Sequence, residues 1–438
     1  MDEETRVRLL AAMESNDLVL LCGAGLSVSA PSLLMSAVNV SQACYDHYQA
    51  IEALPAELRD DVDALAAHFH QAGTFDRLFI NKLVPWNELT GQPNAGHAAV
   101  GDFLLTGAAA FALSANFDGL IEQWCQSQKV FVRGALDGVE ANRFSEFSRP
   151  LLKFHGCMQR EPETTLWTQP QLDDALIAQR IESCRQWMGQ WLPNRHLLVI
   201  GFWTDWGYLN EVLAAAIDAG NSASVTVIDP KTTAQLQQQA PGLWAALSAA
   251  PQFTHLEGSA NEILDELRLE FSRSWARKFY TLGRPLFEAD QHPWDPELID
   301  PSELTMDAIY DARRDAEGEA PDHAARKVAP TIDAAQAAFV HLLVRQAGGV
   351  RDGSWYSLNN RTVRVVNGAG RAIAEVRDRF ARPPAVSTPD IVVCAGAVEF
   401  GVPANVVRSS GGRSIMGPSS GQGSTWMTLA DARVELAI

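Results

Sequence analysis

The chain has 438 residues, too many for one ordinary core and enough for two domains or three. Hydrophobic residues make up 47% of it and charged residues 20%, the balance of a folded soluble protein. Because 53 Asp and Glu stand against 35 Lys and Arg, the formal net charge is −18, and so acidic a surface argues against direct nucleic-acid binding.

The sequence carries no signal for a membrane span, for export or for a structural metal. No apolar run is long enough to cross a bilayer. The N-terminal MDEETRVRLLAAMESND predicts a charged helix without the apolar stretch of a secretory signal, so we expect a cytoplasmic protein. The six cysteines form no CxxC pair, and scattered cysteines in a reducing compartment are usually small buried residues. We therefore expect no metal.

The first 260 residues alternate short apolar runs with longer helical stretches. The predicted strands are Leu18–Cys22, Ala109–Ala115, Val130–Val132, Leu151–His155, His196–Phe202, Ala223–Asp229 and Phe253–Leu256. The predicted helices include Pro93–Leu105, Gly119–Gln126, Gln179–Trp191, Tyr208–Ala219 and Ala260–Phe279. This alternation predicts an α/β fold, a Rossmann-like doubly wound parallel sheet over residues 1–280. A helical insertion at about 32–92 could roof the ligand crevice at the carboxyl ends of the strands.

The C-terminal part of the sequence has a different character. Twelve acids against two arginines in residues 287–322 predict an acidic linker or irregular segment over 281–333. A smaller β-rich α+β domain is predicted over 334–438. Its expected elements are a helix at Ala334–Arg345, strands at Trp355–Leu358, Thr362–Val366, Ile391–Cys394 and Val406–Val407, a hairpin turn at Asn367–Gly368 and a flexible loop at Ser409–Ser424. Residues 345–438 hold eleven arginines and seven acids, and we expect a regulatory or oligomerisation role for this domain.

The first predicted strand runs into a glycine turn, LVLLCGAGLS. Glycines at Gly23 and Gly25 would let the backbone approach a pyrophosphate, and amides at the start of the next helix could neutralise its charge. An ordinary strand-to-helix turn is the alternative. A dehydrogenase fingerprint would need a third glycine where Val28 stands, and Asp46 does not follow a strand, so hydride transfer is disfavoured.

Two further motifs place polar residues where predicted strands end. One is LSANFDGL, which contains Asn116 and Asp118, and the other is LKFHG, which contains His155. The carboxyl ends of strands in an α/β sheet are where ligands bind. Taken singly, Asn116 or Asp118 could be a helix cap and His155 a hydrogen-bonded histidine at a strand end.

In their joint order these motifs resemble the sirtuin superfamily, over residues 17–280. Gly23–Ser27 with Pro31 is similar to the GAGxS…P signature, Asn116–Leu120 to N-x-D-G-L, and His155-Gly156 to the catalytic His-Gly. Four more segments match in order: Pro93-Asn94 with His97, Gly201–Asp205, Val225–Pro230 and Gly258–Ala260.

The sequence departs from the family's protein deacylases in three respects. The zinc-binding cysteine pairs after the His-Gly are missing, Pro31 is followed by Ser-Leu-Leu-Met, and a helix fills the segment between His155 and Gly201. These departures resemble the zinc-less, sirtuin-like NAD hydrolases of bacterial antiphage systems. The resemblance implies an NAD glycohydrolase that releases nicotinamide and ADP-ribose and depletes NAD in abortive infection.

The resemblance also implies roles for individual residues. Asn116 would hold the nicotinamide ribose and the attacking water, His155 would act as general base, and Asp118 would fix the loop or stabilise the developing cation. Residues that would bind the dinucleotide are Gly23, Ala24, Gly25 and Ser27 at the pyrophosphate and Gly201, Asp205, Asp229 and Gly258 near the adenosine half.

Two other functions stay open on the sequence alone, an NAD-dependent protein deacylase and a non-catalytic nucleotide-sensing assembly module. A constitutive NAD hydrolase would poison its host, so we expect regulation by assembly. By family analogy, the expected partners are further copies of the chain and an HerA-type ATPase, with an Argonaute-like protein or a phage trigger as alternatives.

Overall fold

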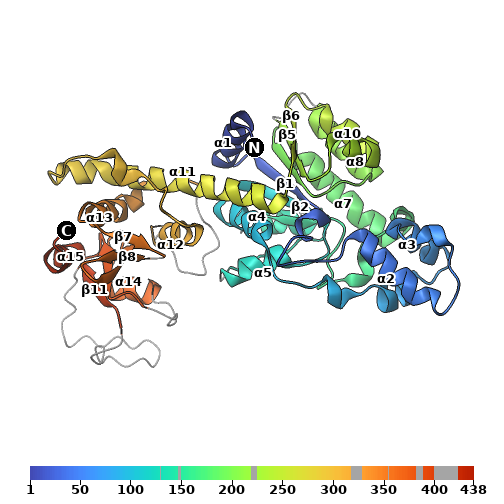
Figure 1. Cartoon of the computed structure of the whole chain (residues 1–438), viewed down its shortest axis with the longest axis horizontal. Coiled ribbons are helices and arrows are strands. Elements are labelled where there is room, and N and C mark those ends of the chain that lie inside the picture. Colours follow the sequence, from blue (N-terminus) through green and yellow to red (C-terminus); the bar gives the residue numbers. More distant parts are fainter. Residues whose placement is uncertain are drawn as a thin grey trace. The chain divides into compact units, whose positions relative to one another are not determined.

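The computed structural model describes residues 1–128, 130–146, 149–218, 224–316, 328–353, 355–380, 388–398 and 423–438. These residues form two compact units, Met1–Arg268 and Leu269–Ile438 (Figure 1). The predicted site residues all belong to the first unit.

The first unit is built on a sheet of six parallel strands. Its strands are β1 (Leu18–Cys22), β2 (Ala109–Ser114), β3 (Leu151–Lys153), β4 (His196–Ile200), β5 (Ser224–Asp229) and β6 (Phe253–Glu257). They lie in the order β3-β2-β1-β4-β5-β6, and every neighbouring pair is parallel. This is the strand order of a Rossmann-type doubly wound sheet, so the predicted fold class is confirmed.

One predicted strand is wrong. Residues 130–132 lie outside the sheet, and only Ala135, further along, forms an isolated bridge to Leu152. Val130 and Val132 are buried while Phe131 is 81% exposed, so the alternation that looks like a strand comes from a loop packing two valines inward.

Helices follow the strands in the predicted alternation. The helices of this unit are α1 (Glu3–Glu14), α2 (Ala37–Gln49), α3 (Val62–Gln71), α4 (Ala95–Thr106), α5 (Leu120–Ser127), α6 (Gly138–Ser145), α7 (Ala175–Trp191), α8 (Gly207–Asp218), α9 (Thr233–Gln239) and α10 (Pro241–Ser248). Alternate strand residues such as Val19, Leu21 and Val199 pack with buried residues of α6 to α10 in one core. Strands covered in this way are why the sequence shows unbroken apolar runs.

The insertion between β1 and β2 is helical, as predicted. It contains α2, α3 and a π-helix at Phe75–Leu83, and it holds no strand. The insertion has its own apolar cluster, which Trp167 joins from the segment after β3. The Trp167 ring lies 5.5 Å from the Phe79 ring and 4.6 Å from the Phe117 ring, centroid to centroid. The insertion is therefore packed against the loop that follows β2.

The second unit combines helices with a five-stranded mixed sheet. Helix α11 (Ala260–Ala289) enters it, and the unit adds α12 (Met306–Ala316), α13 (Ala335–Gln346), α14 (Ile373–Phe380) and α15 (Leu429–Leu436). The strands are β7 (Val350–Asp352), β8 (Trp355–Leu358), β9 (Arg361–Asn367), β10 (Ile391–Ala395) and β11 (Thr425–Thr428), in the order β11-β10-β9-β8-β7. The expected strand Val406–Val407 lies outside the described residues, as does all but the end of Ser409–Ser424.

The predicted hairpin turn at Asn367–Gly368 is wrong. The hairpin joins β8 to β9 through Asn359 and Asn360, whose φ angles of 53° and 60° suit a tight turn of the kind that favours asparagine. After Asn367 the chain instead enters α14 and returns as β10, parallel to β9. The buried Asn367 side chain donates to the carbonyl oxygens of Ala316 and Asp333, at 2.9 and 3.0 Å.

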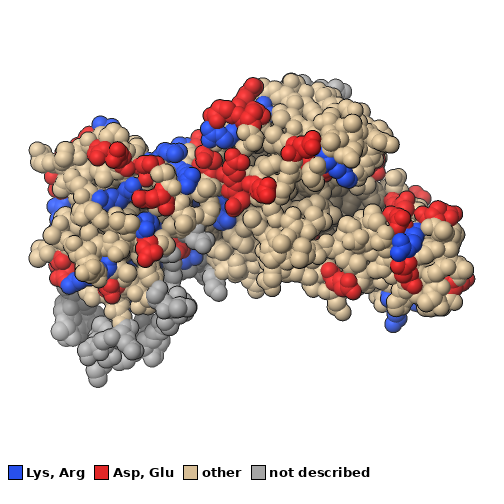
Figure 2. All heavy atoms as spheres, in the orientation of Figure 1, with Lys and Arg blue, Asp and Glu red and all other residues tan. Residues whose placement is uncertain are grey.

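The described residues of the acidic segment, which the sequence predicted to be a linker or irregular, belong to the second unit. Helix α12 contributes the buried residues Ile309 and Ala316 to the unit's core, together with Leu304 just before it. Three acids of the segment pair with arginines that follow it, Asp290 with Arg433, Glu303 with Arg345 and Asp315 with Arg364. The opposite charges of the two stretches are thus partly neutralised within the unit. On the face that Figure 2 shows, Lys and Arg side chains lie among Asp and Glu side chains.

All six cysteines are buried and none forms a disulfide, as the sequence led us to expect. Among the described residues, no helix is both long enough and apolar enough to cross a membrane.

Candidate active site

All the predicted site residues except Asp205 lie along one edge of the six-stranded sheet. Because all six strands are parallel, their carboxyl ends share that edge, and the strand order reverses between β1 and β4. Ligands of open α/β sheets bind outside such a switch point. Gly23 follows β1 directly, and Gly201 follows β4.

The turns after β1 and β4 touch through their backbones. A Cβ atom on Gly25 would lie 2.6 Å from the Gly201 Cα, and one on Gly23 would lie 2.5 Å from the Phe202 Cα. The Gly25 amide donates to the Gly201 carbonyl at 2.9 Å, and Gly201 has a φ of +57°. Only residues without a side chain allow this approach.

The glycine turn differs from its prediction in two respects. Residues Ala24–Leu26 form a single 3-10 turn, and no α-helix begins there. The amides of Leu26 and Ser27 donate to the carbonyls of Gly23 and Ala24, at 3.0 and 2.9 Å. These amides are satisfied within the turn in this conformation, so binding a pyrophosphate through them requires those two hydrogen bonds to open.

Ser27 is the centre of a buried polar network. Its hydroxyl donates to Asp118 Oδ2 at 3.0 Å and accepts from Asn116 Nδ2 at 3.3 Å. Asn116 Nδ2 also donates to the Gly23 carbonyl at 3.0 Å, and Asp118 Oδ1 accepts from the Leu120 amide at 3.0 Å. The structure therefore brings together four predicted site residues, Gly23, Ser27, Asn116 and Asp118, from the segments that follow β1 and β2.

His97 completes this network from the start of α4. The Asn94 amide donates to His97 Nδ1 at 3.2 Å, which leaves the proton on Nε2, and Nε2 lies 3.1 Å from Ser27 Oγ. Burial lowers the pKa of His97 to about 4. The imidazole is therefore neutral at physiological pH and serves as a donor to Ser27.

His155 and Asn116 occupy equivalent positions beyond adjacent strands, but their side chains contact different residues. Ser114 of β2 pairs with Lys153 of β3, so Asn116 and His155 each stand two residues beyond paired positions on adjacent strands. The His155 Nε2 atom lies 2.9 Å from the Tyr208 hydroxyl, and the Trp206 ring packs 4.7 Å from the imidazole. His155 is only 5% exposed, and no described hydrogen bond joins it to Asn116.

The surroundings of His155 fix its protonation state. Burial, with a smaller contribution from Arg180 on α7, lowers the pKa of His155 to about 3. Burial also raises the pKa of Tyr208 well above its usual value. Both partners are neutral at physiological pH. Sequence reasoning missed Tyr208 and Arg180, because neither lies in a motif that marks it as part of a site.

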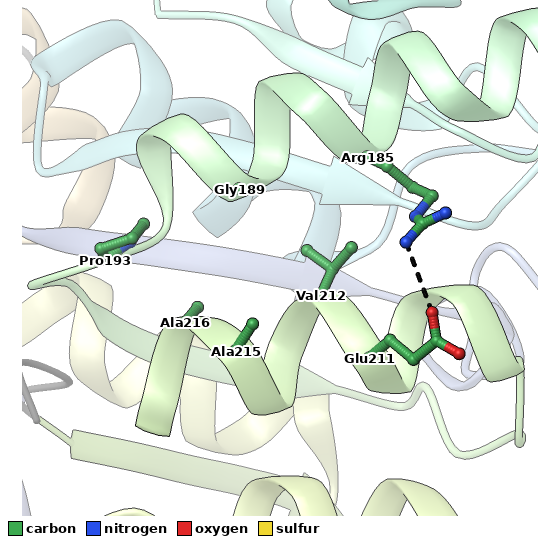
Figure 3. A pocket seen from close by; sticks show the side chains of 7 residues that line it. All are labelled: Arg185, Gly189, Pro193, Glu211, Val212, Ala215 and Ala216. Carbon is green, nitrogen blue, oxygen red and sulfur yellow. Dashed lines mark hydrogen bonds and ion pairs between the residues drawn. The ribbon is translucent and has the colours of Figure 1, made fainter. Parts of the chain in front are cut away.

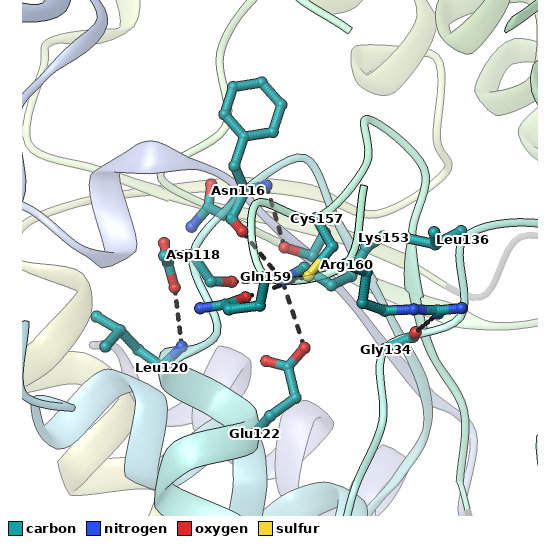
Figure 4. A network of polar contacts seen from close by, with 12 residues as sticks. Asn116, Asp118, Leu120, Glu122, Gly134, Leu136, Lys153, Cys157, Gln159 and Arg160 are labelled. Carbon is teal, nitrogen blue, oxygen red and sulfur yellow. Dashed lines mark hydrogen bonds and ion pairs between the residues drawn. The ribbon is translucent and has the colours of Figure 1, made fainter. Parts of the chain in front are cut away.

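Sequence reasoning also missed Lys153, the last residue of β3, whose side chain reaches the loop that follows β2. Its side chain is 1% exposed and reaches the carbonyl oxygens of Phe117 and Asp118, Cys157 Sγ at 3.4 Å and Glu122 Oε1 at 3.3 Å (Figure 4). Burial lowers the pKa of Lys153, but the Glu122 carboxylate and other nearby groups outweigh it, so the pKa ends above its ordinary value. A fully buried lysine is rare unless it is paired, and here the pair is present.

The residues predicted near the adenosine half fall into two groups. Asp229 ends β5, is buried, and its carbonyl accepts from the Gly258 amide at 3.2 Å, so these two residues lie together at the sheet edge. Asp205 instead accepts from the amides of Gly242 and Leu243 and caps α10. Its carboxylate is engaged in holding that helix.

A shallow pocket of about 350 Å³ lies elsewhere in the first unit (Figure 3). Its lining comes from α7, from Pro193 just after it and from α8, and it includes Arg185, which forms an ion pair with Glu211 at 3.3 Å. None of the predicted site residues lines this pocket.

Comparison with known proteins finds one family model that matches part of the chain. The family model of the SIR2-like domain matches residues 111–252, which include Asn116, His155, Gly201 and Asp229. No curated protein matches the chain.

Several solved Sir2 structures are similar to the chain at low identity. One, from a study of the structural basis for the mechanism and regulation of Sir2 enzymes, is 13% identical over 60% of this chain and 96% of its own, with a TM-score of 0.33. A Sir2 homologue in complex with NAD is 16% identical over 61% of this chain and 92% of its own, with a TM-score of 0.36. A Sir2 homologue variant in complex with ADP-ribose is 16% identical over 61% and 95%, with a TM-score of 0.35.

Proposed function

We propose that this protein is an NAD glycohydrolase that cleaves the bond between nicotinamide and ribose, giving nicotinamide and ADP-ribose. NAD is its substrate, and no metal takes part. The proposal combines the match to the SIR2-like domain with residues of this chain, and the sequence resembles the zinc-less, sirtuin-like NAD hydrolases.

One observation carries the proposal. Asn116 and His155 stand two residues beyond the paired positions Ser114 and Lys153 of the adjacent strands β2 and β3, at the same carboxyl edge of the sheet as the switch point between β1 and β4. A carboxamide and an imidazole at that place can bind and deprotonate a sugar hydroxyl or a water next to it. The backbone contact between Gly25 and Gly201 leaves the edge free of side chains there, as a dinucleotide needs.

The residues divide the proposed chemistry between them. Asn116 orients the ribose and the attacking water, and Asp118, held by Ser27 and the Leu120 amide, faces the positive charge that develops as the glycosidic bond breaks. His155 accepts a proton from the water or from a ribose hydroxyl. Gly23, Ala24, Gly25 and Ser27 would bind the pyrophosphate, and Gly201, Asp229 and Gly258 the adenosine half.

His155 must be uncovered before it can work as a base. A histidine with a pKa of about 3 takes up protons poorly at neutral pH, and Tyr208 occupies its Nε2 atom. The proposed cycle therefore includes a movement of Trp206 or Tyr208 that admits the substrate and exposes the imidazole to polar surroundings. Such a step also keeps the resting enzyme from consuming NAD.

The biological role we propose is antiphage defence in the cytoplasm, by depletion of NAD in an abortive infection. Regulation would come from assembly of the chain with itself and with an HerA-type ATPase. This part of the proposal rests on resemblance and on the need to keep an NAD hydrolase inactive in a healthy cell.

The direct test is to identify the products. The purified full-length chain is incubated with NAD, alone and with the product of the neighbouring gene, and the products are separated by chromatography. We expect nicotinamide and ADP-ribose in equal amounts, and a loss of at least about 100-fold in turnover for Asn116→Ala and His155→Ala. Formation of O-acyl-ADP-ribose only when an acylated peptide is added would instead establish a deacylase, and binding without turnover under every condition would establish a sensor.

A further inference from the structure

Lys153 connects the two strand ends that carry the proposed catalytic residues. It is the last residue of β3, two positions before His155, and its side chain extends to the loop between β2 and α5. Residues 115–119 of that loop have no regular secondary structure. Their position therefore depends on side-chain contacts and on single hydrogen bonds.

The ammonium group of Lys153 binds the main chain of this loop at two successive residues. It donates to the Phe117 carbonyl at 3.4 Å and to the Asp118 carbonyl, which belong to the two residues that directly follow Asn116 (Figure 4). The Asp118 carboxylate, in turn, accepts a hydrogen bond from the Ser27 hydroxyl in the turn after β1. The loop is thus held between the β1 turn and β3. Hydrogen bonds from a charged donor are stronger than those between neutral groups.

The surroundings of Lys153 are arranged to accept its charge. Glu122 on α5 lies 3.3 Å from the ammonium nitrogen and is 18% exposed. Gly134 makes room for the aliphatic chain, since a Cβ atom there would lie 2.4 Å from Lys153 Cδ. With Glu122 as its counter-charge, the ammonium adds no net positive charge beside a sugar that becomes cationic in the proposed reaction.

We infer that Lys153 is a positioning residue, which fixes the main chain of Phe117 and Asp118 and so sets the Asn116 carboxamide relative to His155. Its effect on turnover rests on the proposed function, whereas its effect on the loop does not. A misplacement of about 1 Å in an active site can cost on the order of 100-fold in rate. Loss of the ammonium should therefore lower kcat more than it weakens binding.

The test compares three forms of the full-length protein: wild type, Lys153→Met and Lys82→Met. Methionine keeps the length of the buried chain but cannot donate, and Lys82 is an exposed lysine of the insertion that serves as the matched control. Hydrogen exchange is followed by mass spectrometry in peptides that cover 116–120 and in peptides from the rest of the first unit. Binding of ADP-ribose and the kcat and KM for NAD are measured on the same preparations.

The expected result is a local change. In Lys153→Met, exchange at 116–120 becomes about tenfold faster or more, kcat falls about 10- to 100-fold, and the affinity for ADP-ribose stays within about threefold. Lys82→Met behaves as wild type. Unchanged exchange at 116–120 in folded Lys153→Met would overturn the inference. So would faster exchange over the whole unit together with lost ADP-ribose binding, because that result indicates a structural role only.

A second variant covers the case in which Lys153→Met fails to fold. The double variant Lys153→Met with Glu122→Leu removes both charges, and an apolar pair often replaces a buried ion pair without loss of stability. The inference predicts the same faster exchange and the same fall in kcat, and a normal loop in the double variant would contradict it. If wild type cleaves no NAD, alone or with the product of the neighbouring gene, the proposed function fails, while the exchange at 116–120 still decides the role of Lys153.

Discussion

His97 and His155 belong to separate hydrogen-bond networks, yet burial keeps both imidazoles neutral. The pKa of His97 is about 4 and that of His155 about 3, against an ordinary value near 6.5 in an unfolded chain. Below about pH 6.5 these two imidazoles therefore bind protons in the unfolded chain but stay unprotonated in the folded chain. Stability contributed by these histidines is complete above about pH 7.5 and is lost as the pH falls toward their folded pKa values.

The pH dependence of stability tests this assignment. At pH 5, we expect each of the two histidines to have lowered the free energy of unfolding by about 2 kcal/mol relative to pH 7.5. Urea denaturation of wild type and of His155→Gln at both pH values measures the difference. The variant should lose about 2 kcal/mol less than wild type between the two conditions, and an equal loss would show that His155 titrates normally in the folded protein.

The glycines at the switch point offer a second test at the level of single residues. In Gly25→Ala, the new methyl group would lie 2.6 Å from the Gly201 Cα, a contact that requires the two turns to separate. We expect a destabilisation of about 1–3 kcal/mol and loss of ADP-ribose binding, measured by thermal denaturation and calorimetric titration. Gly189→Ala is the control, since a Cβ at that exposed helical position meets no atom within 4 Å and should cost nothing. Equal behaviour of the two variants would refute the close backbone approach.

At the scale of elements, one ion pair binds α12 to the sheet of the second unit, and another binds α15 to the same strand. Arg364 of β9 forms a bidentate pair with Asp315 of α12, at 2.8 and 2.6 Å, and both side chains are almost fully buried. Arg361, three positions earlier on the same strand, pairs with Glu435, and both of these side chains are 46% exposed. The two pairs differ chiefly in burial.

This difference predicts unequal costs of breaking the pairs. Asp315→Ala leaves a buried guanidinium without its counter-charge, and we expect the free energy of unfolding to fall by about 3–5 kcal/mol. Arg361→Ala should cost less than about 1 kcal/mol, because solvent screens an exposed pair. Urea denaturation of both variants provides the comparison. A cost for Asp315→Ala as small as that for Arg361→Ala would mean that α12 is not anchored through this contact.

The elements also show where local sequence signals fail. Asn367–Gly368 has the composition of a hairpin turn, but its asparagine is buried and bonds two carbonyls, while the hairpin uses Asn359 and Asn360. The acid-rich segment predicted a solvated linker because the sequence does not show that some of its acids form ion pairs with arginines further along the chain. Both errors arise because the decisive partners are distant in sequence.

At the scale of the molecule, the doubly wound parallel sheet of the first unit was predicted from the sequence, although the order of its strands was not. Unbroken apolar runs such as Leu18–Cys22 and polar residues directly behind them indicate a buried parallel sheet with a ligand edge. The positions of Asn116, Asp118 and Ser27 in one network follow from this arrangement. The burial of His155 under Trp206 and Tyr208 could not be predicted, because these two residues follow β4 and lie about 50 positions away in the sequence. Nor could the role of Lys153, because nothing in its local sequence tells a buried lysine from an exposed one.

The central claim is that Asn116 and His155 serve the same sugar, and a crystal structure of the wild-type protein with ADP-ribose tests it most directly. The account predicts the pyrophosphate over the turn at Gly23–Ser27 and the distal ribose within hydrogen-bond distance of the Asn116 carboxamide, with Tyr208 displaced and the His155 imidazole facing that ribose. A distal ribose that contacts neither side chain, or ADP-ribose bound away from this edge of the sheet, would contradict the account.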